Sequence, residues 1–239
     1  MPSNAAIWQH LQQLPMFWLW TTLLIFYLGT RLQQRCKGSP WINPTGISIV
    51  SLVLLLSWSH VPYAEYFRSN QLIHGLLAPA TVALAVPLYQ QLRRIQTLFV
   101  PLLLSLLIGS CVAIILATGS VWLFGGSHVT LLSLAPKSAT TAVSMGISEK
   151  IGGIPSLTAA VVILTGVLGA IVGPLLLNVL GIHSPAIRGF ALGVISHGNG
   201  TARAFQEGET CGAFAGLGMG LNALMTALLI PIFMWLVGW

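Results

Sequence analysis

Residues 95–136 read IQTLFVPLLLSLLIGSCVAIILATGSVWLFGGSHVTLLSLAP and contain no Lys, Arg, Asp or Glu. This stretch is about twice as long as the roughly 20 apolar residues that cross a bilayer as one helix. Two further charge-free stretches cover residues 151–187 and 210–239. Long apolar runs without strict alternation of polar and apolar residues favour helices over barrel strands. The sequence therefore predicts an all-α polytopic membrane protein.

The composition excludes most soluble functions. Of the 239 residues, 55% are hydrophobic and 6% are charged, and the mean hydropathy is +0.86. A soluble domain carries roughly 25% charged residues, so a soluble enzyme, a nucleic-acid reader and a disordered tail are excluded. The net charge of +6 is more consistent with orientation in a bilayer than with nucleic-acid binding. The three cysteines frame neither a disulfide scaffold nor a metal site.

We predict about eight transmembrane spans in a single integral membrane domain, residues 1–239. The expected spans are Leu14–Leu32, Trp41–Trp58, Gln71–Leu92, Ile95–Phe124, Ser127–Ile147, Ile154–Gly181, Ile187–Gln206 and Cys211–Trp239. Most basic residues follow odd-numbered spans, namely Arg31, Arg35, Lys37, Arg93, Arg94 and Lys150. The positive-inside rule places those span ends in the cytoplasm. A re-entrant hairpin in place of one polar span would change both the count and this orientation.

A weak internal repeat links two of these spans. The tripeptide Leu77-Ala78-Pro79 recurs 57 residues later as Leu134-Ala135-Pro136, and each copy is followed by an Ala-Val pair. Internal repeats with broken helices are typical of transporter folds. Chance similarity within an apolar sequence is an equally open explanation.

The span around Pro136 contains polar groups that lipid would not tolerate. Residues 134–146 read LAPKSATTAVSMG. Pro136 breaks a helix and suits the first turn of a new one, whose free backbone N–H groups attract anions. Lys137 adds a full charge, and hydroxyl donors come from Ser138, Thr140 and Thr141. The alternative is that Lys137 reaches the membrane interface and the hydroxyls bond to nearby carbonyls.

The second polar span, residues 193–204, reads GVISHGNGTARA. Gly198 and Gly200 free the backbone to leave the helix, which membrane depth allows only where protein or a water-filled cavity covers the break. The polar residues that can converge on such a cavity are His197, Asn199, Thr201 and Arg203. Arg203 can pair with a carboxylate, and His197 can take up a proton near neutral pH. The alternative is a loop in which Arg203 is solvated and His197 bonds a neighbouring carbonyl.

Pro79 gives a milder signal of the same kind. It can break its helix and open a half-helix as Pro136 does, but we favour a kinked scaffold helix here. The sequence has no zinc-ligand spacing, phosphate loop or catalytic triad, so we expect no enzymatic activity, metal or cofactor.

The last span carries glycine at every fourth position, at Gly208, Gly212, Gly216 and Gly220. Such a smooth stripe lets a neighbouring helix approach closely. We expect it to pack within the chain, and a homodimer seam is the second interpretation.

Two blocks of sequence resemble the LrgB/CidB family. The first block consists of residues 134–138, LAPKS, and residues 145–158, MGISEKIGGIPSLT. The second block consists of residues 196–198, SHG, and residues 200–204, GTARA. The resemblance runs from about Leu77 to Leu224. Two residues depart from it: the family more often has an aliphatic residue at Asn199 and a proline at Ala142.

The resemblance implies a polytopic protein of the bacterial cytoplasmic (inner) membrane, usually paired with a smaller LrgA/CidA-like membrane protein. The pair is described as a holin/antiholin-like regulator of murein hydrolase activity and autolysis. Related proteins include the plastid glycolate/glycerate translocator and bacterial systems for pyruvate uptake or release.

We predict that the chain moves a small anionic metabolite, a 2-oxo or 2-hydroxy monocarboxylate of the pyruvate, glycolate or lactate type, by alternating access. Lys137, Ser138, Thr140 and Thr141 would hold the carboxylate from one half-helix. Asn199, Gly200, Thr201 and Arg203 would close on it from the other, and His197 would couple a proton. The alternative is a non-transporting, holin/antiholin-like regulator of murein hydrolases that acts with the LrgA/CidA-like partner. The absence of Asp disfavours a cation/proton exchanger.

Overall fold

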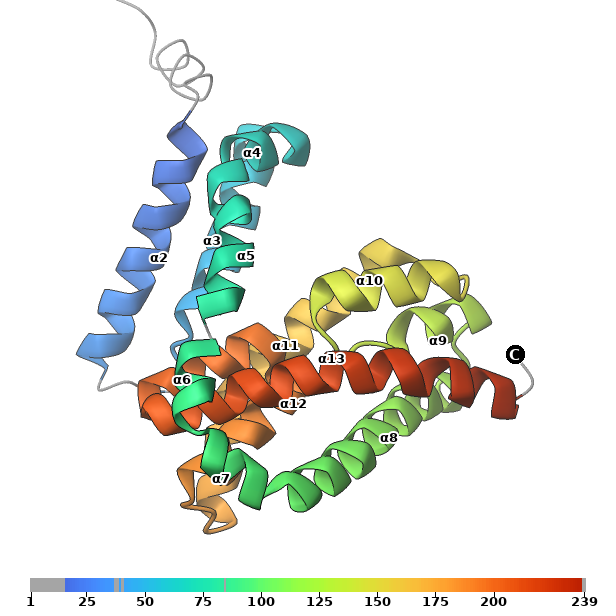
Figure 1. Ribbon diagram of the computed structural model, residues 1–239. Coiled ribbons are helices and arrows are strands. Elements are labelled where there is room, and N and C mark those ends of the chain that lie inside the picture. Colours follow the sequence, from blue (N-terminus) through green and yellow to red (C-terminus); the bar gives the residue numbers. More distant parts are fainter. Residues whose placement is uncertain (1–15, 37–38, 40, 84, 238–239) are drawn as a thin grey trace, which may run out of the picture. The chain divides into compact units, whose positions relative to one another are not determined.

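The computed structural model describes residues 16–36, 39, 41–83 and 85–237. Every regular element in these ranges is a helix, which confirms the predicted all-α class. The chain divides into two compact units, residues 1–83 and 84–239, and each is described by itself (Figure 1).

The first unit contains four described helices. They are α2 (Phe17–Arg35), α3 (Pro44–Ser59), α4 (Tyr63–Ser69) and α5 (Gln71–Ala83). α3 begins at Pro44, and the Asn43 side chain caps it by accepting a hydrogen bond from the Gly46 N–H at 3.0 Å. Pro79 lies inside α5 and opens no half-helix, because membrane helices tolerate the loss of one backbone donor. The two copies of the Leu-Ala-Pro sequence therefore differ in local structure.

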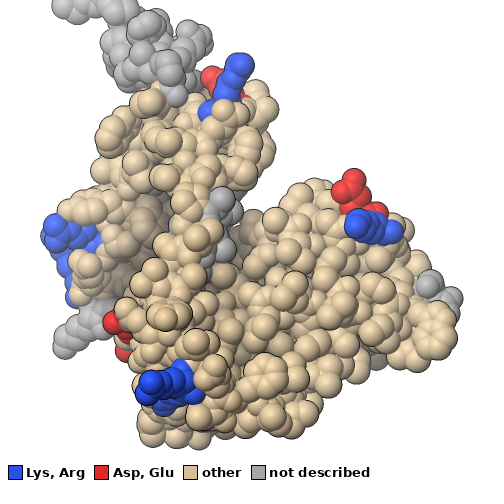
Figure 2. Space-filling model, in the orientation of Figure 1, with Lys and Arg blue, Asp and Glu red and all other residues tan. Residues whose placement is uncertain are grey.

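The second unit contains the predicted polar segments. Its helices are α6 (Ala85–Gln90), α7 (Leu92–Thr97), α8 (Phe99–Leu123), α9 (His128–Leu134), α10 (Thr141–Lys150), α11 (Pro155–Val179), α12 (Pro185–Glu207) and α13 (Glu209–Val237). Within the described residues, three helices are long and apolar enough to cross a bilayer: Phe99–Leu123, Pro155–Val179 and Glu209–Leu236. On the face drawn in Figure 2, charged side chains form a few small groups and most of the surface is uncharged.

Residues 128–150 form a helical hairpin instead of one continuous helix, and we call it the first hairpin. Its arms, α9 and α10, pack together through Leu132 and Ile147, and α11 starts beside α9. The Ile154 N–H donates to Ser133 Oγ at 2.8 Å, and Thr158 Oγ1 donates to the Ser133 carbonyl at 2.8 Å. The chain therefore leaves the first hairpin on the side where it entered.

Helix α12 is also folded back on itself, and we call residues 185–207 the second hairpin. Its arms meet at His197, whose backbone has φ 45° and ψ −125°. Arg188 and Glu207 would lie roughly 28 Å apart in a straight helix, yet Arg188 Nε lies 2.8 Å from Glu207 Oε2. A methyl group on Gly200 would overlap the carbonyl oxygen of Leu192, which confirms that the two arms are in contact.

The two hairpins enter the unit from opposite ends of α11. The first hairpin is held at Ile154, where α11 begins, and the second at Asn178 and Ile182, where it ends. Since α11 has 25 residues and is roughly 37 Å long, it is long and apolar enough to place these ends on opposite sides of a bilayer. The expected crossings Ser127–Ile147 and Ile187–Gln206 are therefore wrong, because each turns back at a helix break.

The orientation expected from basic residues changes with these hairpins. α8 begins beside the second hairpin, because Leu98 and Leu106 pack with Ala186. It ends beside the first hairpin, where Ile114 packs with Leu132. Arg93 and Arg94, just before α8, thus lie on the opposite side from Lys150 at the base of the first hairpin, whereas the sequence predicted that they share a side.

Small residues let the second hairpin pack closely on α13. Methyl groups on Gly189 and Gly193 would overlap the backbone carbonyls of Cys211 and Ala215 on α13. On α13 itself, a methyl group at Gly212 would overlap the Phe205 ring. This part of the glycine stripe thus packs within the chain, as expected.

Candidate functional site

The tips of the two hairpins meet. His197, at the break of the second hairpin, places Nε2 3.2 Å from the carbonyl oxygen of Lys137, which lies in the turn between α9 and α10. Because a carbonyl only accepts, this contact requires Nε2 to carry the proton. His197 is 5% exposed, so the contact lies inside the protein.

Asn222 of α13 connects both tips. Its Nδ2 donates to the carbonyl oxygen of Ser138 in the first hairpin and, at 3.1 Å, to that of Val194 in the second. Its Oδ1 accepts a hydrogen bond from Ser110 Oγ of α8 at 2.8 Å. One buried amide therefore links two long helices and two hairpins.

The tips meet at the middle of the membrane-crossing helices. Ser110 lies near the middle of α8, Gly166 near the middle of α11, and Asn222 near the middle of α13. A methyl group on Gly166 would come within 2.9 Å of Asn199 Nδ2 and 3.3 Å of His197 Nδ1. The polar layer is therefore roughly 16–20 Å from the helix ends, near the membrane midplane.

Apolar clusters close this polar layer on both sides. Towards the base of the second hairpin, the buried residues of the cluster are Leu106, Ala186, Phe190 and Phe214. Towards the first hairpin, they are Ile114, Leu132, Ala135, Ile230 and Met234. The contacts of Asn222 and His197 lie between these two clusters, and a second group of buried polar residues, Ser133, Ser148 and Thr158, lies at the start of α11.

The first break lies between Pro136 and Thr140, and the new helix begins at Thr141 rather than at Pro136. Thr140 occupies the N-cap position, and no side chain caps the helix. The first N–H groups of α10 therefore lack acceptors within the helix. The Pro136 carbonyl, by contrast, accepts from Ser144 Oγ at 2.7 Å.

The second break lies at His197 instead of Gly198. A positive φ is the conformation that glycine adopts most readily, so the backbone of His197 is strained. Gly198 and Gly200 follow in the second arm, and Thr201 Oγ1 donates to the His197 carbonyl at 2.9 Å. The Thr201 hydroxyl therefore stabilises the start of the second arm, to which Thr201 itself belongs.

Lys137 is a half-buried cation at the tip of the first hairpin. No acidic side chain in the described ranges lies within ion-pair distance of it. An unpaired ammonium at this depth is costly and marks a functional site in most membrane proteins. Thr140 and Thr141 beside it are also half-buried.

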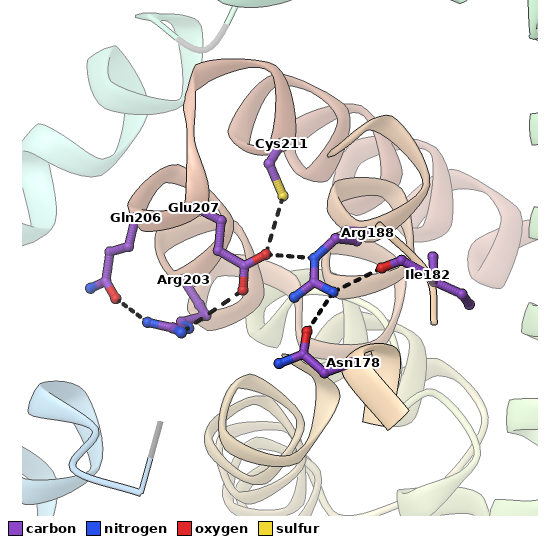
Figure 3. A network of polar contacts seen from close by, with 7 residues as sticks. All are labelled: Asn178, Ile182, Arg188, Arg203, Gln206, Glu207 and Cys211. Carbon is purple, nitrogen blue, oxygen red and sulfur yellow. Dashed lines mark hydrogen bonds and ion pairs between the residues drawn. The ribbon is translucent and has the colours of Figure 1, made fainter. Parts of the chain in front are cut away.

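Arg203 lies away from the tips, at the base of the second hairpin (Figure 3). It is six residues past His197, which corresponds to roughly 9 Å along the arm. Its Nη1 donates to Gln206 Oε1 at 2.8 Å, and its Nη2 lies 3.8 Å from Glu207 Oε1. The structure thus separates Arg203 from Lys137.

Glu207 is the centre of this network at the base. Its second carboxylate oxygen binds Arg188, whose Nη1 also donates to Asn178 Oδ1 at 2.8 Å and to the Ile182 carbonyl at 2.9 Å (Figure 3). The network joins the two arms of the second hairpin to the end of α11. Arg203 and Glu207 stand at i,i+4 spacing, which favours a pair on one helix face, whereas Arg188 lies in the other arm, where no local spacing indicates the contact.

Sequence reasoning also missed Asn222 as part of the site and Ser110 as its hydrogen-bond partner. A single serine or asparagine in an apolar helix usually makes one interhelical hydrogen bond. The available signal was their position in the middle of a charge-free run, where a polar side chain needs a partner.

These features define a helical integral membrane protein in which two re-entrant hairpins, entering from opposite sides, meet at a polar site near the midplane. The chain belongs to the LrgB-like family, which matches residues 22–236 and so spans both units.

Curated relatives cover nearly the whole chain. YwbG of Bacillus subtilis (strain 168) is 37% identical over 214 residues, 89% of this chain and 94% of the relative. Holin-like protein CidB of Staphylococcus epidermidis is 32% identical over 88% of this chain and 92% of its own length. Antiholin-like protein LrgB of Bacillus cereus is 30% identical over 94% of this chain and 97% of its own length. No solved structure matches the chain.

Proposed function

We propose that this protein carries small monocarboxylates across the bacterial cytoplasmic membrane by alternating access and that it is not an enzyme. The observation that supports this most is the meeting of two opposed hairpin tips at the midplane. Transporters commonly place their substrate site at the midplane, between broken helices of opposite orientation. Because each hairpin enters from a different side, each can close the site towards that side.

The chemistry of the tips favours an anion. The carbonyls of Lys137, Ser138 and Val194 already accept hydrogen bonds from His197 or Asn222. Two donors at the tips have no described partner: the Lys137 ammonium and the first amides of α10. A carboxylate would compensate both, since anions are stabilised at helix N-termini and by an ammonium.

The substrate class we propose is a 2-oxo or 2-hydroxy acid of the pyruvate, glycolate or lactate type. Its carboxylate would bind Lys137 and the α10 amides, together with the hydroxyls of Thr140 and Thr141. Asn199 would contact the rest of the molecule from the second hairpin, because its amide lies beside Gly166 next to His197. Arg203 would act at the base of the second hairpin rather than on the carboxylate.

Uptake of labelled pyruvate, glycolate and lactate into liposomes that contain the purified protein tests this function. Lys137→Gln should abolish saturable uptake, because it removes the charge at the tip. Lys150→Gln is the matched control, since Lys150 is exposed at the end of α10. Equal saturable uptake by both variants would falsify the assignment of the site.

Proton coupling by His197 is a separate part of the proposal. His197→Gln keeps a side-chain N–H that can donate to the Lys137 carbonyl, but it cannot take up a proton at neutral pH. We expect uptake by this variant to persist and to lose its response to an imposed pH gradient. A response equal to that of the unmodified protein would exclude His197 as the proton carrier.

The names of two relatives, holin-like CidB and antiholin-like LrgB, favour a second candidate function. In this alternative the protein regulates murein hydrolases and autolysis, together with an LrgA/CidA-like membrane partner. Solute leakage without saturation from liposomes that hold both proteins, and altered autolysis in cells, would support it. Saturable uptake by the purified chain alone would favour transport.

A further inference from the structure

Asn222 contacts both hairpin tips, and the residue is 1% exposed. We propose that it is the positioning residue of the site: its amide NH₂ group holds the two tips in the register that forms the carboxylate pocket. This inference rests on the proposed function and adds a residue that touches no substrate.

The two carbonyls that Asn222 binds belong to the interrupted backbone. Ser138 lies between α9 and α10, and Val194 lies three residues before the break at His197. Carbonyls in the last turn before a break have no donor within their own helix. At a depth without bulk water they need a protein donor, and Nδ2 is shared between one carbonyl from each hairpin.

Ser110 binds the end of the amide that faces away from the tips. Its hydroxyl donates to Oδ1 of Asn222 at 2.8 Å, which leaves the NH₂ group directed at the two carbonyls. The two carbonyls, which only accept, require the NH₂ group to face the tips, whereas Ser110 contacts neither tip in this network. This separation of roles provides a control that removes a hydrogen bond from the same amide but leaves both tip contacts in place.

The register matters because the proposed substrate groups lie within a few residues of these carbonyls. Lys137 precedes Ser138, and His197 follows Val194 by three residues. A relative shift of the tips would separate the Lys137 ammonium from the second hairpin. In alternating access, opening one hairpin breaks one of the two Nδ2 contacts, and the other keeps Asn222 attached to the closed hairpin.

Distances between spin labels on the two hairpins test the proposal without any substrate. Labels at Ala142 and Ala202, which are exposed on α10 and on the second arm, report the separation of the hairpins. Asn222→Asp keeps the oxygen that Ser110 binds but faces the two carbonyls with an acceptor. We expect its distance distribution to broaden and shift to longer distances, whereas Ser110→Ala stays like the unmodified protein.

The uptake assay gives a second readout. For Asn222→Asp we expect the KM for pyruvate to rise about tenfold, which corresponds to about 1.4 kcal/mol, with a much smaller change in the maximal rate. If this variant is not monodisperse in detergent, Asn222→Ser, which is too short to span both carbonyls, takes its place in both assays.

Unchanged distance distributions in the Asn222 variants would overturn the proposal, as would equal broadening in Ser110→Ala. Broadening in the Asn222 variants without saturable uptake by the unmodified protein would instead refute the proposed transport and leave the positioning role intact.

Discussion

Neutralising Glu207 should weaken the base of the second hairpin. Glu207 accepts from Arg188 at 2.8 Å and lies 3.8 Å from Arg203, and the three side chains are 18%, 11% and 16% exposed. In Glu207→Gln the amide oxygen can still accept one hydrogen bond, but two largely covered guanidinium groups lose their counter-charge. Hydrogen bonds to charged groups contribute about 1.5–3 kcal/mol, and solvent access lowers that figure, so we expect a loss of about 1–2 kcal/mol.

The corresponding shift in Tm is roughly 2–8 °C for a chain of this size. Thermal unfolding of the purified protein in detergent, followed by tryptophan fluorescence, measures it. The shift should shrink at high salt, because the network is partly exposed and salt screens it.

Glu209→Gln is the matched control, because Glu209 is exposed two residues further along the chain and has no described partner in the network. A Tm loss in Glu207→Gln no larger than in Glu209→Gln would refute the reasoning. The double-mutant cycle with Arg188→Gln should show that the two substitutions are not additive, since the residues are in direct contact.

Two further predictions concern the hairpins and their packing. In a cysteine-free background, Ser127→Cys and Glu149→Cys should react with a membrane-impermeant reagent that is added on the same side of the membrane. His183→Cys should react with the reagent only from the opposite side. Labelling of Ser127→Cys and Glu149→Cys from different sides would contradict the hairpin. Gly193→Ala should lower the Tm by several degrees, because its methyl group would overlap the Ala215 carbonyl. Gly220→Ala should leave the Tm unchanged, since nothing lies within 4 Å of its methyl position. Equal Tm values for the two variants would rule out the close contact.

The sequence predicted the crossing helices well, because their signal is local. The charge-free runs correspond to α8, α11 and α13, and the polar segments at Lys137 and His197 do contain helix breaks. A charge-free run longer than the bilayer thickness has few alternatives to a membrane helix. Composition and hydropathy were therefore sufficient for this part of the fold.

The direction of the chain after each break could not be predicted in the same way. A segment that crosses and a segment that turns back have the same composition, and the difference lies in contacts between distant residues. Arg188 with Glu207, and Ser133 with Ile154, are 19 and 21 residues apart. Such pairs have no local periodicity, so no pattern in the sequence indicates them.

The sequence also predicted only those residues of the candidate site that have a local signal. Lys137 and His197 stood out because ionisable groups are rare in apolar spans. Asn222 did not, because its importance comes from its position opposite two carbonyls on two other segments. Arg203 has the right chemistry for a carboxylate, but the fold directs it to Glu207.

The dependence of the second hairpin on α13 has a consequence for biogenesis. Its arms are synthesised before α13, yet their close backbone contacts at Cys211 and Ala215 and the donor for the Val194 carbonyl all come from that helix. Lipid cannot supply these partners. We therefore expect membrane insertion of residues 185–207 to wait until α13 has left the ribosome, so that a nascent chain truncated before α13 should hold this segment at the bilayer surface.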